Sequence, residues 1–159
     1  MFAFAVSHDS KPEFYRDLVQ AIDGVTAGET DGIANMANVA AILWQYLPDL
    51  NWAGFYRNLG GELVLGPFQG QAACVRISFD RGVCGAAART LQTHNVADVH
   101  RFPGHIACDA ASRSELVVPI VGKTGLIAVL DLDSPLLTRF DSDDVVGCEV
   151  IARLLSGRI

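Results

Sequence analysis

The first fifty residues carry apolar side chains at the spacing of two successive amphipathic helices. Ser10 followed by Glu13 makes a capping-box pattern, and a helix is predicted from Lys11 to Ile22. The stretch GVTAGETDG that follows is typical of a loop. Asp31 then supplies the N-cap of a second helix, which ends as Pro48 approaches. The apolar positions of this second helix, which we expect in the core, are Ile33, Met36, Ala37, Ala40, Leu43, Trp44 and Leu47.

Beyond residue 51 the pattern changes to short β-type runs separated by glycine and proline. Six strands are predicted, with the sequences WAGFYR, ELVLG, ACVRIS, NVADV, SELVVPIV and GLIAVLDLD. The alanine-rich GVCGAAARTLQ between the third and fourth predicts a short helix. The segment FDSDDVVGCEVIARLLSG is acidic at its start and basic near its end, which predicts a closing helix. Helices at both ends of the chain with an antiparallel sheet between them indicate an α+β domain.

Two aspartates of the last strand share one face. Period-two alternation places the carboxylates of Asp131 and Asp133 side by side. Their face would also carry Ile127 and Val129, and the opposite face Leu126, Ala128, Leu130 and Leu132. Like charges at that distance raise at least one carboxyl pKa, so one group can hold a cation while another donates a proton. Glu115 begins the strand that would pair with this one through VGKTG and could be a third member, although a solvated strand end also fits the spacing.

An aromatic pair marks the first strand. Trp52 and Tyr56 share a face with Gly54 under the same alternation. Such a pair fits either the core or the wall of a pocket. Aromatic faces attract ammonium and methylthio groups, so a wall would suit a sulfur-containing amino acid.

The cysteines stand in different surroundings, and no two of them form a CxxC pair. Cys74 shares the less apolar side of its strand with Arg76. Cys84 follows Gly82 at a helix start, where the helix dipole and free N–H groups favour a thiolate, although a small residue chosen for tight packing also fits. Cys148 lies on the apolar stripe of the closing helix, and we assign it to the core.

Cys108 lies in the long irregular segment HRFPGHIACDAASRS. His105 precedes it by three residues, and Arg101 and Arg113 flank it. These groups would stabilise a thiolate if the loop folds them inward, so we predict that Cys108 is a nucleophile. For any single cysteine of this chain, simple core packing remains an alternative.

Composition limits the classes of function. A chain of 159 residues suits one domain that buries roughly two thirds of its unfolded surface. A hydrophobic fraction of 50% excludes general disorder, and a net charge of -6 with only 12 Lys and Arg argues against a nucleic-acid partner. No apolar run reaches the roughly twenty residues of a membrane span, and the N-terminus lacks the basic flank of a targeting signal. We therefore expect no membrane association and a cytosolic location, where thiols stay reduced unless they are catalytic or bound to metal.

Several long segments together resemble the free methionine-(R)-sulfoxide reductases, which are single GAF domains. They are NWAGFY, LVLGPFQGQAACVRI, RGVCGAAA, DVHRFPGHIACDAASRSELVVPI and GLIAVLDLDSP. The likeness runs from about Lys11 to Leu155. It implies a GAF-like six-stranded antiparallel sheet flanked by N- and C-terminal helices, one domain over residues 1–159, and a homodimer.

The resemblance also implies roles for individual residues. Cys108 matches the nucleophilic cysteine, Cys74 the principal resolving cysteine and Cys84 the auxiliary one. The pocket for the free amino acid would be formed by Trp52, Tyr56, Glu115, Asp131 and Asp133. We predict that the Cys108 thiolate attacks the sulfur of free methionine-(R)-sulfoxide while a protonated carboxyl supplies a proton. The resulting sulfenic acid would form a disulfide that a thioredoxin-like dithiol reopens, with no metal or organic cofactor.

Two other classes of protein remain open at this point. A GAF module that senses a nucleotide or tetrapyrrole would share the fold without catalysis, although such modules generally sit in longer chains. A structural zinc protein could use Cys74, Cys84, Cys108 and His105, although no CxxC spacing supports it.

Overall fold

The computed structural model describes residues 4–7, 9–104 and 110–159. Its helices are α1 (Lys11–Thr26), α2 (Gly32–Tyr46), α3 (Gly82–Thr90) and α4 (Ser142–Leu155), with a short 3-10 helix η1 at Val99–Arg101. Its strands are β1 (Trp52–Asn58), β2 (Glu62–Gly70), β3 (Arg76–Ser78), β4 (His94–Val96), β5 (Ser114–Gly122) and β6 (Gly125–Ser134). No helix in the described segments is long and apolar enough to cross a membrane.

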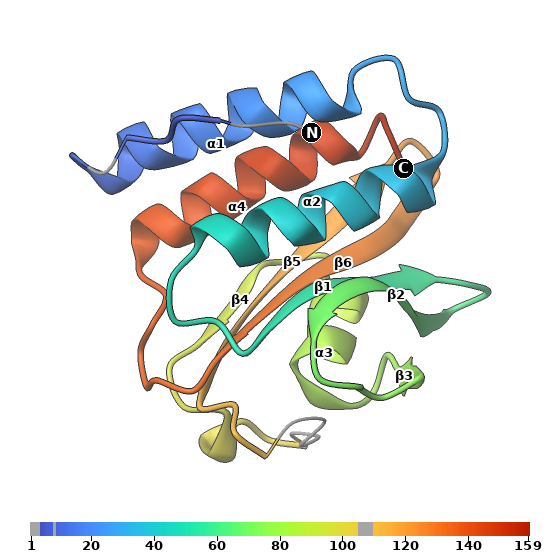
Figure 1. Cartoon of the computed structure of the whole chain (residues 1–159). Coiled ribbons are helices and arrows are strands. Elements are labelled where there is room, and N and C mark those ends of the chain that lie inside the picture. Colours follow the sequence, from blue (N-terminus) through green and yellow to red (C-terminus); the bar gives the residue numbers. More distant parts are fainter. Residues whose placement is uncertain (1–3, 8, 105–109) are drawn as a thin grey trace.

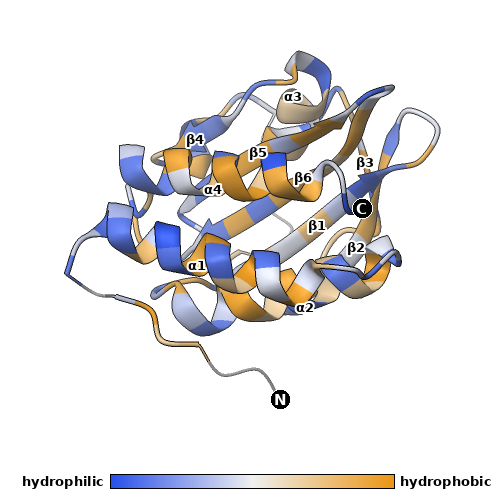
Figure 2. Cartoon of the chain, turned by 90° about the horizontal axis from the view of Figure 1, so that it is seen from above, coloured by the Kyte–Doolittle hydropathy of each residue, from blue (hydrophilic) through white to orange (hydrophobic). Residues whose placement is uncertain are grey.

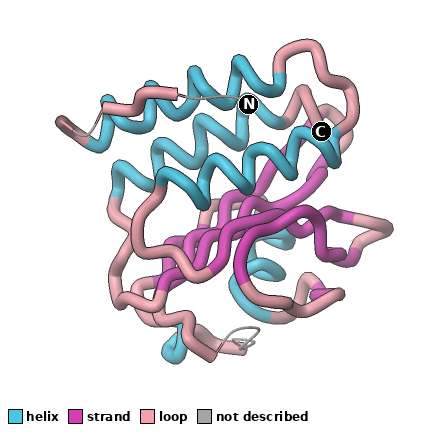
Figure 3. The backbone as a smooth tube through the Cα atoms, viewed as in Figure 1, coloured by secondary structure: helices cyan, strands magenta, loops and turns pink. Residues whose placement is uncertain are grey.

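The strands form one antiparallel sheet in the order β3-β2-β1-β6-β5-β4. Helices α1, α2 and α4 lie on one side of this sheet, and α3 lies on the other (Figure 1). The sequence prediction of an α+β fold with six antiparallel strands is therefore confirmed. Loops gather at the end of the sheet where β5 begins and β6 ends (Figure 3).

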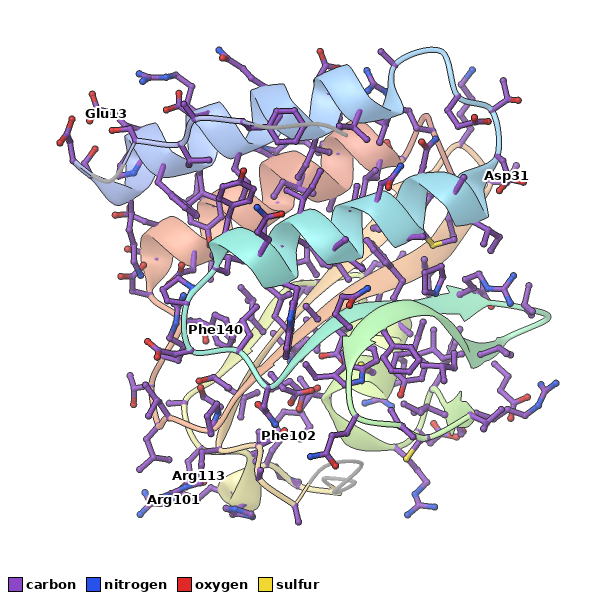
Figure 4. All side chains as sticks on the ribbon, in the orientation of Figure 1. Glu13, Asp31, Arg101, Phe102, Arg113 and Phe140 are labelled. Atoms are coloured by element: carbon purple, nitrogen blue, oxygen red, sulfur yellow. The ribbon has the colours of Figure 1, made fainter. Side chains whose placement is uncertain are left out.

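The N-terminal helices begin where the capping residues predict. Ser10 accepts a hydrogen bond from the Glu13 backbone N–H, and Asp31 accepts two from the first turn of α2. Both starts are labelled in Figure 4 by Glu13 and Asp31. Helix α1 runs one turn further than expected, to Thr26, whose buried hydroxyl donates to the carbonyl of Ile22 at 2.8 Å.

The core face of α2 differs from the prediction. Ile33, Ala37 and Trp44 are exposed, with Ile33 at 45% and Trp44 at 39%. The buried positions of the helix are Asn35, Met36, Val39, Ala40, Ile42 and Leu43. Because α2 is apolar on most of its circumference, periodicity alone left the direction of its buried stripe ambiguous, and packing against β1 and β2 decides it.

Two hydrophobic clusters lie on opposite faces of the sheet. The larger one fills the space between the sheet and α1, α2 and α4, and contains Phe55, Leu116, Leu130 and Cys148. The smaller one lies under α3 and contains Trp52, Tyr56, Val117 and Val129. Figure 2 colours the chain by hydropathy. Strands β5 and β6 are mostly apolar, and α1 alternates between apolar and polar residues. The face under α3 is the one that carries the polar groups described below.

A β-bulge changes the faces at the start of β6. Ile120 pairs with Ala128 but Val121 pairs with Leu126, so Ile127 is an extra residue between two pairs. Leu126 therefore packs under α3 and Ile127 packs on the side of α1, α2 and α4, the reverse of the expectation. From Ala128 onward the predicted alternation holds, because Asp131 shares its face with Val129 and not with Leu130.

Two predicted strands are shorter than expected. The run ACVRIS forms a strand only over Arg76–Ser78, so Cys74 lies in the loop between β2 and β3 and not within β3. The run NVADV forms a strand only to Val96. Asp98 then accepts a hydrogen bond from the His100 backbone N–H and caps η1, which turns the chain away from the sheet.

Candidate active site

Three carboxylates meet on the face of the sheet beneath α3. Glu115 on β5 lies directly opposite Asp133 on β6, and Asp131 lies opposite Val117 on the same strand pair. Glu115 is 7% exposed and Asp131 is 5% exposed. The interpretation of these acids as a solvated strand end is therefore wrong for Glu115 and Asp131, which are buried. This burial is the first mark of a functional site, because acidic side chains are rarely buried without a partner of opposite charge.

Helix α3 places a thiol beside these acids. Cys84, in the first turn of the helix, is 4% exposed, and its Sγ lies 3.9 Å from Oε1 of Glu115. One ligand-type atom each from Cys84, Glu115 and Asp131 lies within 4.8 Å of the others. The described residues thus hold a thiol and two carboxyl groups in one buried cluster, a set that also suits a metal ion.

Burial dominates the protonation of this cluster. Loss of hydration raises the pKa of Glu115 well above its ordinary value, and the neighbouring charges of Asp131 and Asp133 raise it further. Loss of hydration also raises the pKa of Asp131 to about 7, against the opposing effect of its hydrogen bonds. At neutral pH, then, the cluster contains both protonated and ionised carboxyl groups. A proton donor and a negative charge are available side by side.

The same environment acts on Cys84 in the opposite sense to the sequence expectation. A helix start favours a thiolate, but burial and the charges of Asp131 and Glu115 raise the pKa of the Cys84 thiol well above its ordinary value. The helix dipole is a weak effect by comparison with desolvation inside a protein. Cys84 is therefore a protonated thiol in this structure.

An aromatic wall borders the acids. Trp52 and Tyr56 stack with ring centroids 5.7 Å apart, and Phe68 on β2 stacks on Trp52 at 5.3 Å. Trp52 also donates its ring N–H to the carbonyl of Gln71 at 3.2 Å. Burial and the charge of Asp131 raise the pKa of Tyr56, so its phenol stays protonated. Trp52 and Tyr56 belong to both the smaller core cluster and the pocket wall, so both sequence interpretations hold for them.

These groups line one pocket of ≈ 520 Å³, including its solvent-open mouth. Its lining residues are Trp52, Tyr56, Gln71, Ala72, Ala73, Ile77, Gly82, Val83, Cys84, Ser112, Glu115, Asp131 and Asp133. A hollow lined by acids and aromatic rings suits a small ligand and not a folded protein segment. The acidic and aromatic side chains of the lining determine which ligands such a pocket can bind.

Comparisons with known proteins agree with this architecture. The family described as GAF domain matches residues 29–159. A protein of Escherichia coli named free methionine-R-sulfoxide reductase is 51% identical over 146 residues, which cover 91% of this chain and 88% of that protein. The Saccharomyces cerevisiae protein of the same name is 39% identical over 158 residues, covering 94% of this chain and 88% of that protein. The chain belongs to the GAF-domain free methionine-R-sulfoxide reductases.

A solved structure of the family has the same fold. The X-ray structure of the Neisseria meningitidis free methionine-R-sulfoxide reductase in complex with its substrate superposes with a TM-score of 0.94 at 44% identity. The superposition covers 99% of this chain and 95% of that one. This agreement shows the GAF fold and the family, and the resemblance inferred from the sequence segments is confirmed.

The predicted site residues of this free methionine-R-sulfoxide reductase family member fall into three groups. The pocket brings together Cys84 and all five residues predicted to bind substrate, namely Trp52, Tyr56, Glu115, Asp131 and Asp133. Cys74 is half-buried in the loop 71–75, of which Gln71, Ala72 and Ala73 line the pocket. Cys108 and His105 lie outside the described residues. The loop that contains Cys74 therefore also forms part of the pocket lining.

Two arginines do not take part in the described site. The sequence suggested that Arg101 and Arg113 would stabilise a Cys108 thiolate if the loop folds them inward. Both side chains are exposed, Arg101 pairs with Asp98 at 3.5 Å, and neither lines the pocket. Figure 4 shows both at the periphery of the molecule. Arg101 is turned outward by η1, and the proposed effect of the two arginines on Cys108 stays a prediction, because Cys108 lies outside the described residues.

Two pocket residues carry no signal in the sequence pattern. Ser112 is 3% exposed, lines the pocket, and its Oγ accepts a hydrogen bond from the side-chain amide of Asn51 at 3.0 Å. Gln71 contributes both a carbonyl to Trp52 and part of the lining. Both lie in loops, where hydrophobic periodicity gives no information. Cys148, by contrast, is fully buried in the larger cluster, and its assignment to the core is confirmed.

Proposed function

We propose that this protein reduces free methionine-(R)-sulfoxide to methionine. The observation that carries the proposal is that the buried acids Glu115 and Asp131 line the same pocket as Trp52. Ammonium needs a negative partner, a methylthio group favours an aromatic face, and a sulfoxide oxygen needs a proton donor. The pocket supplies all three. The family relatives named free methionine-R-sulfoxide reductases support the same substrate.

Substrate binding would divide the carboxyl groups by protonation state. An ionised carboxylate pairs with the substrate ammonium, and the positive charge of the ammonium compensates the buried negative charge. A carboxyl with a raised pKa, Glu115 or Asp131, remains protonated and points its proton at the sulfoxide oxygen. The methyl and sulfur of the substrate lie against Trp52. The free amino acid would bind better than peptide-bound methionine, whose amide nitrogen carries no charge to pair with the carboxylate.

The reaction would use two of the cysteines implied by the family resemblance, Cys108 and then Cys74. The Cys108 thiolate attacks the substrate sulfur, and the sulfoxide oxygen takes a proton from the neighbouring carboxyl. Methionine is released as that oxygen ends on Cys108 as a sulfenic acid, so the cysteine is oxidised by two electrons and the sulfoxide is reduced by two. Cys74 then displaces water from the sulfenic acid and forms a disulfide, which a thioredoxin-like dithiol reopens by exchange.

The two candidate resolving cysteines differ in environment. Cys74 lies half-buried in a loop and its sulfur is disulfide-bonded, whereas Cys84 is a buried free thiol whose pKa is raised. A protonated, enclosed thiol is a poor nucleophile. This contrast supports Cys74 as the principal resolving residue and Cys84 as the auxiliary one. We propose that the protein works in the cytosol, because repeated reduction of the disulfide needs a compartment rich in reduced dithiols. The homodimer is proposed from the family resemblance alone.

The decisive assay uses separated R and S sulfoxides, each as the free amino acid and within a peptide. We expect turnover of free methionine-(R)-sulfoxide only. Methionine is quantified by chromatography with a dithiol reductant, and the Cys148→Ser variant serves as the control for a thiol outside the pocket. Equal turnover of both isomers, or of the peptide-bound form, contradicts the proposal.

The same protein preparation tests the alternative of a sensor module. A non-catalytic GAF module would bind a cyclic nucleotide or a tetrapyrrole and leave every sulfoxide unchanged. Titration with these ligands by calorimetry, alongside the turnover assay, separates the two functions.

A further inference from the structure

The pocket contains a ligand set of mixed chemistry that the proposed reaction does not need as a unit. Cys84, Glu115 and Asp131 come from α3, β5 and β6, and one donor atom of each lies within 4.8 Å of the other two. Cys84 Sγ and Glu115 Oε1 are 3.9 Å apart. A substrate ammonium and a sulfoxide oxygen require only oxygen groups. The sulfur makes the cluster different from a simple ammonium site.

Negative charge in this cluster has no positive partner among the described residues. Oδ1 of Asp131 is buried and has no hydrogen-bond partner there, although its residue is only 5% exposed. The pocket lining in the described part of the chain contains no Lys, Arg or His. A buried carboxylate oxygen without a partner costs free energy, and that cost favours any cation able to reach it.

The separation of Cys84 Sγ and Glu115 Oε1 is close to that of two donors in a tetrahedral metal site. Zinc bonds of about 2.3 Å to sulfur and about 2.0–2.2 Å to oxygen place the two donors roughly 3.5 Å apart. The observed separation of 3.9 Å therefore needs only a small change of side-chain torsion. The open mouth of the pocket supplies water as a further ligand. Sulfur among the donors favours zinc or cadmium over magnesium or calcium.

We propose that Cys84, Glu115 and Asp131 bind a thiophilic divalent cation, zinc in the cell, and that the bound ion excludes the amino-acid substrate from the pocket. Formation of the metal–sulfur bond releases the Cys84 proton to solvent, and no group is oxidised or reduced. Exclusion follows because the ion occupies the carboxylates that would hold the substrate ammonium. This competition rests on the proposed function, whereas the binding of the ion does not. Zinc would therefore act as a reversible competitive inhibitor.

The binding test removes the other reactive thiols first. In a Cys74→Ser/Cys108→Ser double variant, cadmium is titrated while the thiolate-to-metal charge-transfer absorbance in the ultraviolet is followed. We expect one saturable band per chain, which zinc abolishes by displacement. Adding Cys84→Ser should remove the band, and adding Cys148→Ser, the matched control for a buried thiol, should leave it unchanged. A band that survives Cys84→Ser, or that never forms in the double variant, overturns the proposal.

A variant of a carboxylate ligand tests the metal site without changing its sulfur ligand. In the same double-variant background, Asp131→Asn should weaken zinc binding in calorimetry by about tenfold or more, since even outer-shell partners of metal ligands change affinity by roughly 10- to 100-fold. Unchanged affinity contradicts the ligand assignment.

Turnover measurements then separate this inference from the proposed function. In the wild-type enzyme, zinc should raise the KM for methionine-(R)-sulfoxide without lowering kcat, and a chelator should restore the original KM. A fall in kcat at unchanged KM places the inhibitory ion elsewhere and rejects exclusion of the substrate. A protein that binds cadmium through Cys84 but turns over no sulfoxide retains the metal site and loses the proposed function.

Discussion

The thiol sulfur of Cys84 lies 3.9 Å from Oε1 of Glu115, so a helix residue and a strand residue 31 positions apart share one buried site. This contact makes the first turn of α3 part of the pocket floor. It also determines the chemistry of the thiol, because the loss of hydration and the charges of the surrounding acids raise the pKa of Cys84. The Cys84 thiol is therefore protonated and poorly reactive, and the neighbouring Glu115 carboxyl retains its proton.

Cysteine alkylation should therefore be selective. Burial raises the pKa of Cys148 to about 12 and raises that of Cys84 well above its ordinary value, so both thiols should resist iodoacetamide at neutral pH in the folded, reduced protein. Cys74 lies in a half-buried loop and, once its disulfide is reduced, should react much faster than either. Mass spectrometry after timed quenching measures the order, with urea-unfolded protein as the control in which all cysteines react. Fast labelling of Cys84 in the folded state would contradict the assigned protonation.

The cysteines proposed for the reaction should separate in kinetics. Cys108→Ser should abolish methionine formation, because no thiolate remains to attack the sulfoxide. Cys74→Ser should retain the first turnover and slow the thioredoxin-dependent steady state, because only the recycling disulfide is affected. Rapid-quench single-turnover assays and steady-state assays with a dithiol protein measure the two phases. Full steady-state activity in Cys108→Ser would reject the assignment.

Stability should fall as pH rises across the titration of Asp131. Its folded pKa is about 7 against an ordinary 3.8, so between these values the folded state holds a proton that the unfolded state has released. Stability therefore decreases through this window and levels off above it. The groups around Asp131 are Glu115, Cys84 and Tyr56 from other elements and Asp133 from its own strand, and the pKa of Glu115 is shifted in the same direction.

Asp131→Asn tests this directly. The variant should melt at a higher temperature than wild type at about pH 8, by about 2–4 °C for each kcal/mol gained, with a much smaller gain at about pH 5. Thermal melts with a chelator present make the measurement, and sulfoxide turnover should fall at the same time. A wild-type melting temperature that rises over this window would show that the folded state does not retain the proton.

Gly54 should tolerate no side chain. A Cβ built there would lie 2.4 Å from Cβ of Phe68 and 2.8 Å from Cη2 of Trp52, so Gly54→Ala must push the aromatic wall out of place. We expect a loss of about 1–3 kcal/mol in the free energy of unfolding and an increased KM. Gly24→Ala on α1, where no atom lies within 4 Å, is the matched control and should stabilise by about 0.5–1 kcal/mol. Urea titration and steady-state kinetics measure both effects, and a wild-type KM in Gly54→Ala would argue against the wall.

Asp144 should be the most sensitive charged residue outside the pocket. It is 1% exposed and accepts hydrogen bonds from Lys11 at 2.6 Å, Tyr15 at 2.8 Å and Arg139 at 3.1 Å. Asp144→Ala leaves the largely buried Arg139 without its partner and should cost about 3–5 kcal/mol.

The neighbouring Asp143 is a matched control, since its side chain accepts no hydrogen bond that ties α4 to α1. Asp143→Ala should change the free energy of unfolding by about 0.5 kcal/mol or less. Chemical denaturation followed by circular dichroism compares the two variants. Similar losses in both would show that charge at the start of α4, and not the buried network, stabilises the helix pair.

Local rules in the sequence determine the elements and much of the site. The cap at Asp31 starts α2, the acidic start and basic end of α4 define the closing helix, and period-two alternation places Asp131 and Asp133 on one face. These features depend on residues within a few positions of one another. A sequence pattern contains that information directly, and the family segments extend it to the GAF fold.

Tertiary packing decides what depends on distant partners. The bulge at Ile127 is created by its pairing with β5, the buried side of α2 by the strands beneath it, and the outward turn of Arg101 by η1. Above all, the pKa of Cys84 is set by its burial between α3 and the sheet and by carboxylates on two other elements, and these outweigh the helix-start effect visible in the sequence. Desolvation depends on the whole surrounding of a group in three dimensions, and no local pattern encodes it.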